Sequence, residues 1–383
     1  MNHACSSRLP ACVQPLNIPD NAHCTSLKST MHTKAFRALP LAIFLLTVGL
    51  HGQLPIEPGN PVNYAKIAFR PEEWTKQNLN PLLIPWPGEN IVFLAQPQEF
   101  DGKLMSRWVQ RLDEGWRLYT ELTGESPKPH KQLAGLPTIA AVPNSSVTCG
   151  VGCGFVGATG IELAKFYSDD WPTLVRDPDS MPHYAFYEMG RNFYTFGDRH
   201  SCFTTGFAVF MRYVCMDTLR CNDTDSATRR IIEDIESHIK ASPLSFLQIF
   251  TNAADLSEKL PRIKQPNGTH LHPSDQPVTY ASAMLRLRRE LGGNDWLKRF
   301  FRLLAECPTA PKNTADGALS QSWNWYLCAS LAAQRDLSTI FCDEWKLPLS
   351  QQTRDQLRSL DWTKPNTRIA DLQKKISPLW ASN

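Results

Sequence analysis

The sequence lacks an excess of charge of either sign: 40 Lys and Arg residues stand against 37 Asp and Glu residues, a net charge of +3 in 383 residues. It also lacks a repeat of fixed period. Its 42% hydrophobic content and balanced charge exclude a disordered chain and do not favour a strongly charged partner. The missing repeat counts against a coiled coil or a repeat array. A chain of this length predicts one large two-lobed domain or two domains.

Three familiar signatures of catalysis or binding are also missing. There is no Cys-x-x-Cys pair, which counts against a thiolate zinc cluster, and no serine has the surroundings of a Ser-His-Asp nucleophile. The glycine-dense segment 149–160 lacks the lysine of a phosphate-binding loop. We therefore predict a hairpin there, pinned by a disulfide and leading to an edge strand at 161–163.

A mostly apolar run is present near the amino end. Residues 38–50 follow Lys34 and Arg37, which is the pattern of a secretory signal. These 13 residues are fewer than the roughly 20 that a membrane-spanning helix needs, so we predict a signal peptide over 31–52 that is cleaved. Because an export signal normally begins close to the start of a chain, residues 1–30 are predicted to be an extension that precedes the true start, or a leader.

Export sets the expected location and the expected state of the cysteines. We predict a secreted, periplasmic or cell-envelope protein with no stable membrane span, and a signal-anchored protein as the alternative if the signal stays uncleaved. Eight of the 11 cysteines lie beyond residue 52, and an even number in an exported chain favours disulfides. Closeness in the sequence makes Cys149 with Cys153 and Cys215 with Cys221 the candidate pairs.

The mature chain is predicted to have a mixed front part and a helical back part. Residues 53–90 are rich in Pro and Asn, with Trp74 and Trp86 as isolated anchors, which indicates an extended lead-in that packs on the body. A mixed α/β lobe is expected over 91–196 and an α-helical lobe over 197–383. The predicted class is α+β, with a mixed β-sheet in the amino-terminal lobe and helices in the carboxy-terminal lobe.

A β-α-β unit is predicted to open the mixed lobe. Residues 91–95 form a short apolar strand, Asp101 caps a helix with apolar residues at helical spacing, and Gly124 ends that helix. A second strand follows at 137–142 and is expected to run parallel to the first. Later helices are predicted over 204–219, 226–241, 243–253, 278–291, 295–305, 319–333, 337–345 and 351–360.

One predicted helix carries the residues of most chemical interest. Residues four apart lie on one face of a helix, and zinc metallopeptidases use this spacing for two His ligands, with a Glu base directly after the first. Here those positions are Tyr187, Glu188 and Arg191, in a helix predicted to open at Ser180 and Pro182.

This arrangement resembles the zincins, and more narrowly the gluzincins. Thr205 precedes Gly-Phe-Ala at the place where the third gluzincin ligand, a glutamate, precedes the same three residues. Residues 280–300 and 336–350 are similar to the closing helices of enhancin-like and mucin-degrading members. The resemblance covers roughly residues 90–360, and it implies a zincin-like two-lobed fold with Glu188 on the active-site helix.

The sequence departs from the family at all three zinc-ligand positions, which are Tyr187, Arg191 and Thr205 here. Three protein ligands are usual for catalytic zinc, and a permanently protonated guanidinium cannot be one of them. At about 4 Å, a dication and a guanidinium repel each other by roughly 8 kcal/mol at an effective dielectric near 20. We therefore predict no metal and no other cofactor, whereas Glu188 and Arg191 can pair along the helix.

Three interpretations of this site stay open. It is a structural polar network, or a cleft that binds a peptide or a glycan, or an active hydrolase in which Glu188 is the base. In the hydrolase, His183 and His200 are substitute zinc ligands, or Glu188 acts without metal. Our prediction is a catalytically inactive pseudopeptidase. Nucleic acid is not an expected partner, because the basic residues over 286–302 fit two amphipathic helices. The residues expected at the cleft are Tyr187, Arg191, Thr205, His183 and His200.

Overall fold

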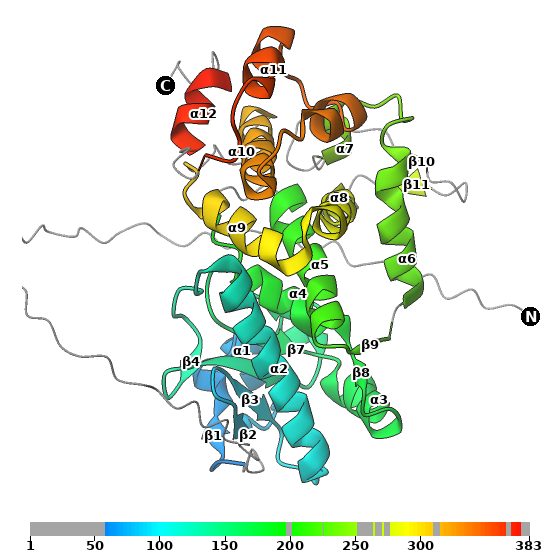
Figure 1. Ribbon diagram of the computed structural model, residues 1–383. Helices are drawn as coiled ribbons and strands as arrows, with labels where there is room; N and C mark the ends of the chain where they lie inside the picture. The colour runs from blue at the N-terminus through cyan, green and yellow to red at the C-terminus, as the bar shows by residue number, and fades with distance from the viewer. Residues whose placement is uncertain are drawn as a thin grey trace, which may run out of the picture. The chain divides into compact units, whose positions relative to one another are not determined.

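A mixed β-sheet and many helices make up the part of the chain that the structure describes, which confirms the predicted α+β class (Figure 1). Backbone contacts divide the chain into Met1–Pro55 and Ile56–Asn383, and every described residue belongs to the second unit. The predicted signal peptide and His200 lie outside the described residues. The computed structural model describes residues 58–196, 201–224, 226–250, 263–264, 270–271, 276–308, 315–364 and 369–376.

Seven strands form the main sheet, in the order β1-β2-β3-β5-β7-β6 with β4 paired to β5. Strands β3, β5 and β7 are parallel, whereas β2 and β6 run antiparallel to their neighbours β3 and β7. Two small pairs, β8 with β9 and β10 with β11, lie outside this sheet. The strands are β1 (Val62–Asn63), β2 (Leu82–Pro87), β3 (Val92–Ala95), β4 (Gln132–Leu133), β5 (Leu136–Ala141), β6 (Gly152–Gly154), β7 (Ile161–Leu163), β8 (Ser180–Met181), β9 (Asn222–Asp223), β10 (Ile263–Lys264) and β11 (His270–Leu271).

The helices become more frequent after β8. Short 3₁₀ segments are η1 (Tyr64–Lys66), η2 (Ser145–Val147) and η4 (Glu236–His238), and wider π-type turns are η3 (Phe166–Asp170) and η6 (Thr339–Glu344). The α-helices are α1 (Pro71–Lys76), α2 (Gly102–Thr123), α3 (Trp171–Arg176), α4 (His183–Asn192), α5 (Ser201–Thr218), α6 (Ser226–Ile235), α7 (Phe246–Phe250), α8 (Gln276–Leu291), α9 (Gly293–Ala305), α10 (Ala315–Ala333), α11 (Gln351–Arg358) and α12 (Ile369–Ile376).

The predicted β-α-β unit is confirmed. The Asp101 carboxylate accepts a hydrogen bond from the Leu104 N–H at 2.9 Å, which satisfies one of the unpaired donors in the first turn of α2. At the other end Gly124 has φ 72°, the left-handed conformation that closes a helix at low cost for glycine. Strand β5 then pairs with β3 in parallel, as expected for a crossover through one helix.

Both faces of the sheet are buried, and the segment predicted as a lead-in causes this. Phe93 and Ile139 belong to a large core, which includes residues of α2 and α4, whereas Leu94 belongs to a smaller core on the other face together with Tyr64 and Trp74. Residues 58–90 therefore give the sheet strands β1 and β2 and also cover one of its faces. This differs from an extended lead-in, because two short strands in a Pro- and Asn-rich segment leave little pattern in the sequence.

The glycine-dense segment forms the predicted hairpin. Cys149 and Cys153 are joined by a disulfide, which confirms that pair, and β6 turns back to run antiparallel to β7. The edge position is corrected: among the described strands β6 is the edge strand, and β7 lies inside the sheet next to β5.

The carboxy-terminal part is helical, as predicted. Helix α5 packs against α4 and α8, and α9 packs against both α2 and α10 (Figure 1). The segment predicted as a helix over 337–345 contains the π-type turn η6 instead, and α12 was not predicted. The division into lobes at residue 196 stays a prediction. No helix in the described ranges is long and apolar enough to cross a bilayer.

Candidate functional site

Helix α4 carries His183, Tyr187, Glu188 and Arg191, so one element positions four of the predicted site residues. The helix begins at His183 with Pro182 in the cap position, because proline has no N–H to leave unpaired there. The prediction that the helix opens at Ser180 is wrong. Ser180 lies in β8, where its hydroxyl donates to the Asp177 carboxylate at 2.8 Å and not to the helix.

Glu188 is the buried carboxylate of this helix, with 6% of its surface exposed. Burial raises its pKa from the usual 4.5 to about 7, because the charged form loses its hydration. The positive charge of Arg191 and a hydrogen bond from the Gly154 backbone act in the opposite direction and favour the carboxylate. Glu188 is therefore poised between its neutral and charged forms near neutral pH.

Two glycines of β6 allow α4 to lie directly against the edge of the sheet. A Cβ atom at position 154 would come within 2.5 Å of the Glu188 carbonyl oxygen, and one at position 152 within 2.9 Å of the Glu188 Cγ. Real Cβ atoms essentially never come this close to such atoms. Gly152 and Gly154 thus permit the close packing between helix and strand.

The backbone of Gly154 is held by α4 on the side away from β7. Flanking bonds from Ala164 N to Val151 O and from Phe155 N to Gly160 O join the hairpin, so that Gly154, which lies between them, directs its own N–H and C=O outward. Its carbonyl oxygen accepts from the Arg191 Nε at 3.4 Å, and its backbone favours the charged form of Glu188. We call the residues Glu188, Arg191 and Gly154 the α4–β6 clasp.

Asn192, the last residue of α4, adds hydrogen bonds between this helix and the same hairpin. The Asn192 Nδ2 donates to the carbonyl oxygens of Phe155 and Gly160 at 3.0 and 3.2 Å, and the Gly157 N–H donates to the Arg191 carbonyl oxygen at 3.0 Å. The end of α4 is therefore tied to both sides of the hairpin that Cys149 and Cys153 close.

A second buried carboxyl lies beside the clasp. Asp170 accepts a hydrogen bond from the Tyr184 hydroxyl and is only 4% exposed, so burial raises its pKa from 3.8 to about 7. Tyr184 also approaches Glu188, because a Cβ at Gly152 would meet both side chains, at 3.1 and 2.9 Å. Sequence analysis missed Asp170 and Tyr184, since no spacing relates a loop carboxyl to a helix that begins 13 residues later.

His183 and Thr205 hold other positions in the structure. The His183 Nδ1 lies 3.4 Å from an Asp223 carboxylate oxygen, and five residues separate His183 from Glu188, which places them on different faces of α4. Thr205 is a half-buried residue of α5. The structure therefore assembles Glu188 with Arg191 and leaves His183 in a separate polar pair.

The partly exposed face of α4 is aromatic and basic. Tyr184, Tyr187 and Arg191 are spaced by three and four residues, so they form one stripe along the helix, and all three are half-buried. The stripe runs beside Glu188 and the edge strand β6. Side chains of these two types are enriched at binding surfaces.

The residues at the expected ligand positions do not fit zinc. Arg191 is a fixed cation that already donates to the Gly154 carbonyl oxygen, and neither Tyr187 nor Thr205 brings a charge that a dication prefers. Within the described ranges, no group of three or more His, Cys, Asp or Glu side chains is placed to hold a metal ion.

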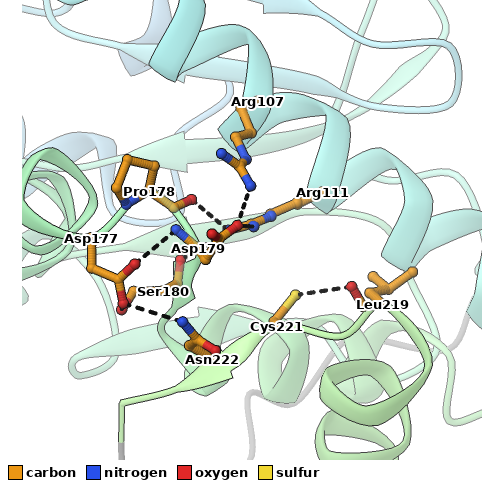
Figure 2. A network of polar contacts seen from close by, with 9 residues as sticks. All are labelled: Arg107, Arg111, Asp177, Pro178, Asp179, Ser180, Leu219, Cys221 and Asn222. Atoms are coloured by element: carbon orange, nitrogen blue, oxygen red, sulfur yellow. Dashed lines mark hydrogen bonds and ion pairs between the residues drawn. The ribbon is translucent and has the colours of Figure 1, made fainter.

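The second predicted disulfide is corrected. Cys215 and Cys221 are separate thiols. Cys215 is buried within α5, whereas the chain reverses after that helix through Arg220 at φ 55°, and the Cys221 N–H donates to the Met216 carbonyl oxygen. Figure 2 shows the Cys221 sulfur directed at the Leu219 carbonyl oxygen, 3.9 Å away.

Comparison with known proteins gives no family for this chain. No protein-family model and no curated protein matches this chain. Two crystal structures from Bacillus anthracis strain Ames, described as a functionally unknown conserved protein and its mutant, are similar with TM-scores of 0.45 and 0.43 at 9% and 11% identity. Each match covers 75% of this chain but only 54% and 53% of the other, so this chain spans about half the length of those proteins.

Proposed function

We propose that the chain is an exported, zincin-like pseudopeptidase whose former active-site helix serves structure and ligand binding in place of zinc catalysis. The observation that carries this proposal is the α4–β6 clasp. Arg191, at a position where the resemblance expects a zinc ligand, donates to the Gly154 carbonyl oxygen, and Glu188 packs closely against β6. A cation held there disfavours a dication in the same place.

The clasp also bears on how a peptide would bind. An extended peptide usually binds a sheet by pairing with the free N–H and C=O groups of an edge strand. At Gly154 the outward-facing carbonyl oxygen is already paired with Arg191. We therefore place ligand binding on the stripe of Tyr184, Tyr187 and Arg191, where aromatic faces and a guanidinium suit a peptide or a glycan.

Ligand arrays test this binding role. The exported protein is applied to a peptide array and a glycan array, and each hit is measured again with Tyr187→Ala and with Arg176→Ala, a change of an exposed residue on α3. We expect the Tyr187 variant to lose at least about tenfold in affinity, which is about 1.4 kcal/mol, while the Arg176 variant keeps it. Equal binding by both variants would contradict the proposed binding surface.

The alternative function is hydrolysis at Glu188, and one observation favours it. Glu188 and Asp170 both have pKa values raised to about 7. The Tyr184 hydroxyl donates to Asp170, and the Tyr184 ring lies near Glu188 beside Gly152. A carboxyl group with a pKa near the working pH is suited to general acid–base catalysis. Turnover of a quenched-fluorescent peptide library that Glu188→Gln abolishes and Arg176→Ala leaves intact would establish this function in place of the pseudopeptidase.

A further inference from the structure

Two thiols from neighbouring helices meet in the helical part of the chain. Cys307 lies just after the end of α9, Cys328 lies within α10, and their sulfur atoms are 3.5 Å apart. Cys328 is fully buried, whereas Cys307 is partly exposed. The sequence offers no hint of this pair, because 21 residues separate the two cysteines.

Contacts on both sides of the thiols hold the two helices together. The Trp296 Nε1 donates to the Ala329 carbonyl oxygen at 3.3 Å, and the Arg299 Nε donates to the Ala332 carbonyl oxygen at 2.9 Å. A disulfide has a sulfur–sulfur distance of about 2.05 Å, so bond formation requires the sulfur atoms to approach by about 1.5 Å. Rotation of the two side chains can supply this movement while the helices stay in place.

We propose that Cys307 and Cys328 form a second disulfide of the mature protein when a small disulfide oxidant, such as oxidised glutathione, is present. The partly exposed Cys307 reacts first: its thiolate attacks the glutathione disulfide, forms a mixed disulfide and releases one glutathione. The Cys328 thiolate then attacks the Cys307 sulfur and releases the second glutathione. The two cysteines lose two protons and two electrons, and one glutathione disulfide becomes two thiols.

The other cysteines serve as internal comparisons. Cys215 and Cys221 are free thiols, and Cys342 lies partly buried near Arg354 and Asp336. Cys149 and Cys153 already form a disulfide that spans four residues. A Cys307–Cys328 bond would instead tie α9 to α10 and close a loop of about 20 residues, which restricts the unfolded chain more strongly.

Oxidation of the exported protein tests the proposal. The protein is reduced, treated with oxidised glutathione and alkylated, and the disulfides are identified by peptide mapping. We expect a Cys307–Cys328 peptide and a melting temperature about 4 °C above that of the Cys307→Ser variant treated identically, whereas Cys342→Ser forms the bond as the wild type does. Cys307 is partly exposed, so its change to serine leaves the core intact. The test therefore does not depend on a substitution of the fully buried Cys328.

Three results would overturn the proposal. Alkylation of both Cys307 and Cys328 after oxidation, in protein that has formed the Cys149–Cys153 bond, would show that the contact does not close. A bond from Cys328 to Cys202 would show a different partner. An unchanged melting temperature with the bond formed would remove the stabilising role.

Discussion

The backbone carbonyl oxygen of Glu188 on α4 lies so close to Gly154 on β6 that a Cβ atom at the glycine would come within 2.5 Å of it. Arg191, one turn later in the same helix, donates to the carbonyl oxygen of the same glycine at 3.4 Å. The two residues that the resemblance to zinc peptidases singles out thus lie against the edge of the sheet. The close approach of α4 and β6 therefore determines how changes at Gly154 and Glu188 should affect the protein.

The close approach predicts that Gly154→Ala destabilises the protein. The added Cβ would lie 2.5 Å from a backbone carbonyl oxygen of α4, which cannot rotate away as a side chain can. We expect a loss of about 1–3 kcal/mol in the free energy of unfolding, measured by urea denaturation.

Gly102→Ala is the matched control. A Cβ at Gly102 meets nothing within 4 Å, and the residue lies in the first turn of α2, where alanine favours the helix. This variant should be as stable as the wild type or more stable by up to about 1 kcal/mol. Equal effects of the two changes would contradict the close contact at Gly154.

The raised pKa of Glu188 predicts a pH dependence of stability. Its pKa is about 7 in the folded protein against 4.5 ordinarily, so the folded state binds a proton more tightly than the unfolded state. The contribution is full below about pH 4.5, declines as pH rises, and is lost above about pH 7. This contribution amounts to about 3 kcal/mol, because a difference of one pKa unit corresponds to about 1.4 kcal/mol.

Glu188→Gln isolates this contribution, because glutamine keeps a side-chain oxygen acceptor but does not titrate. The difference in unfolding free energy between pH 5 and pH 8.5 should be smaller in the variant than in the wild type. Asp170→Asn should act in the same direction, since burial raises its pKa to about 7 as well. An unchanged pH profile in Glu188→Gln would show that Glu188 has its ordinary pKa, and it would contradict the burial of this side chain.

A second polar network predicts unequal roles for two arginines of α2. Arg111 and Arg107 both contact the Asp179 carboxylate, but Arg111 also donates to the carbonyl oxygens of Pro178 and Ser180 at 2.9 and 3.1 Å (Figure 2). The Arg111 side chain is 11% exposed and that of Arg107 46%. Arg111→Ala should cost about 2–3 kcal/mol, because it leaves two carbonyl groups without their donor.

Arg107→Ala should cost less than about 1 kcal/mol, because exposed ion pairs contribute little. Thermal unfolding of the two single variants, followed by circular dichroism, measures the difference. A larger effect at Arg107 than at Arg111 would count against the network as described.

The helical part makes a fourth prediction about stability, at Arg286 of α8. Its guanidinium contacts Glu236 at 2.5 Å and Glu344 at 2.6 Å, and Glu236 also accepts from the Trp345 indole at 2.6 Å. Arg286→Met removes the shared cation and leaves the buried carboxylate of Glu236 near the half-buried one of Glu344. We expect a loss of about 3 kcal/mol in unfolding free energy, whereas Arg289→Met, at an exposed position of the same helix, should change it by less than about 0.5 kcal/mol.

The elements that sequence analysis predicted well have strong local signals. Helix α2 has its capping residue Asp101, its apolar stripe and its terminal glycine at Gly124, so its ends follow from the sequence to within a residue. The disulfide of Cys149 with Cys153 follows from closeness in an exported chain. The same reasoning predicts a bond between Cys215 and Cys221, which are free thiols in the structure.

Features that depend on distant parts of the chain were missed for a physical reason. Glu162 lies in β7 between two core residues, and the sequence pattern alone would leave it on an exposed face. In the structure that face is covered by residues 58–90, and Glu162 accepts from the Tyr64 hydroxyl at 2.8 Å and the Phe69 N–H at 3.0 Å. Burial raises its pKa despite these bonds. The sequence predicts that residues 53–90 pack on the body, but nothing local indicates which face of the sheet they cover.

The metal content of the exported protein, purified without chelators and measured by inductively coupled plasma mass spectrometry, tests the central claim most directly. We predict less than about a tenth of an equivalent of zinc or any other transition metal, because Arg191 is a fixed cation beside Glu188 and the three changed positions offer zinc no suitable set of ligands. Close to one zinc per chain, lost on His183→Ala or His200→Ala, would contradict the account and identify a different, metal-dependent site.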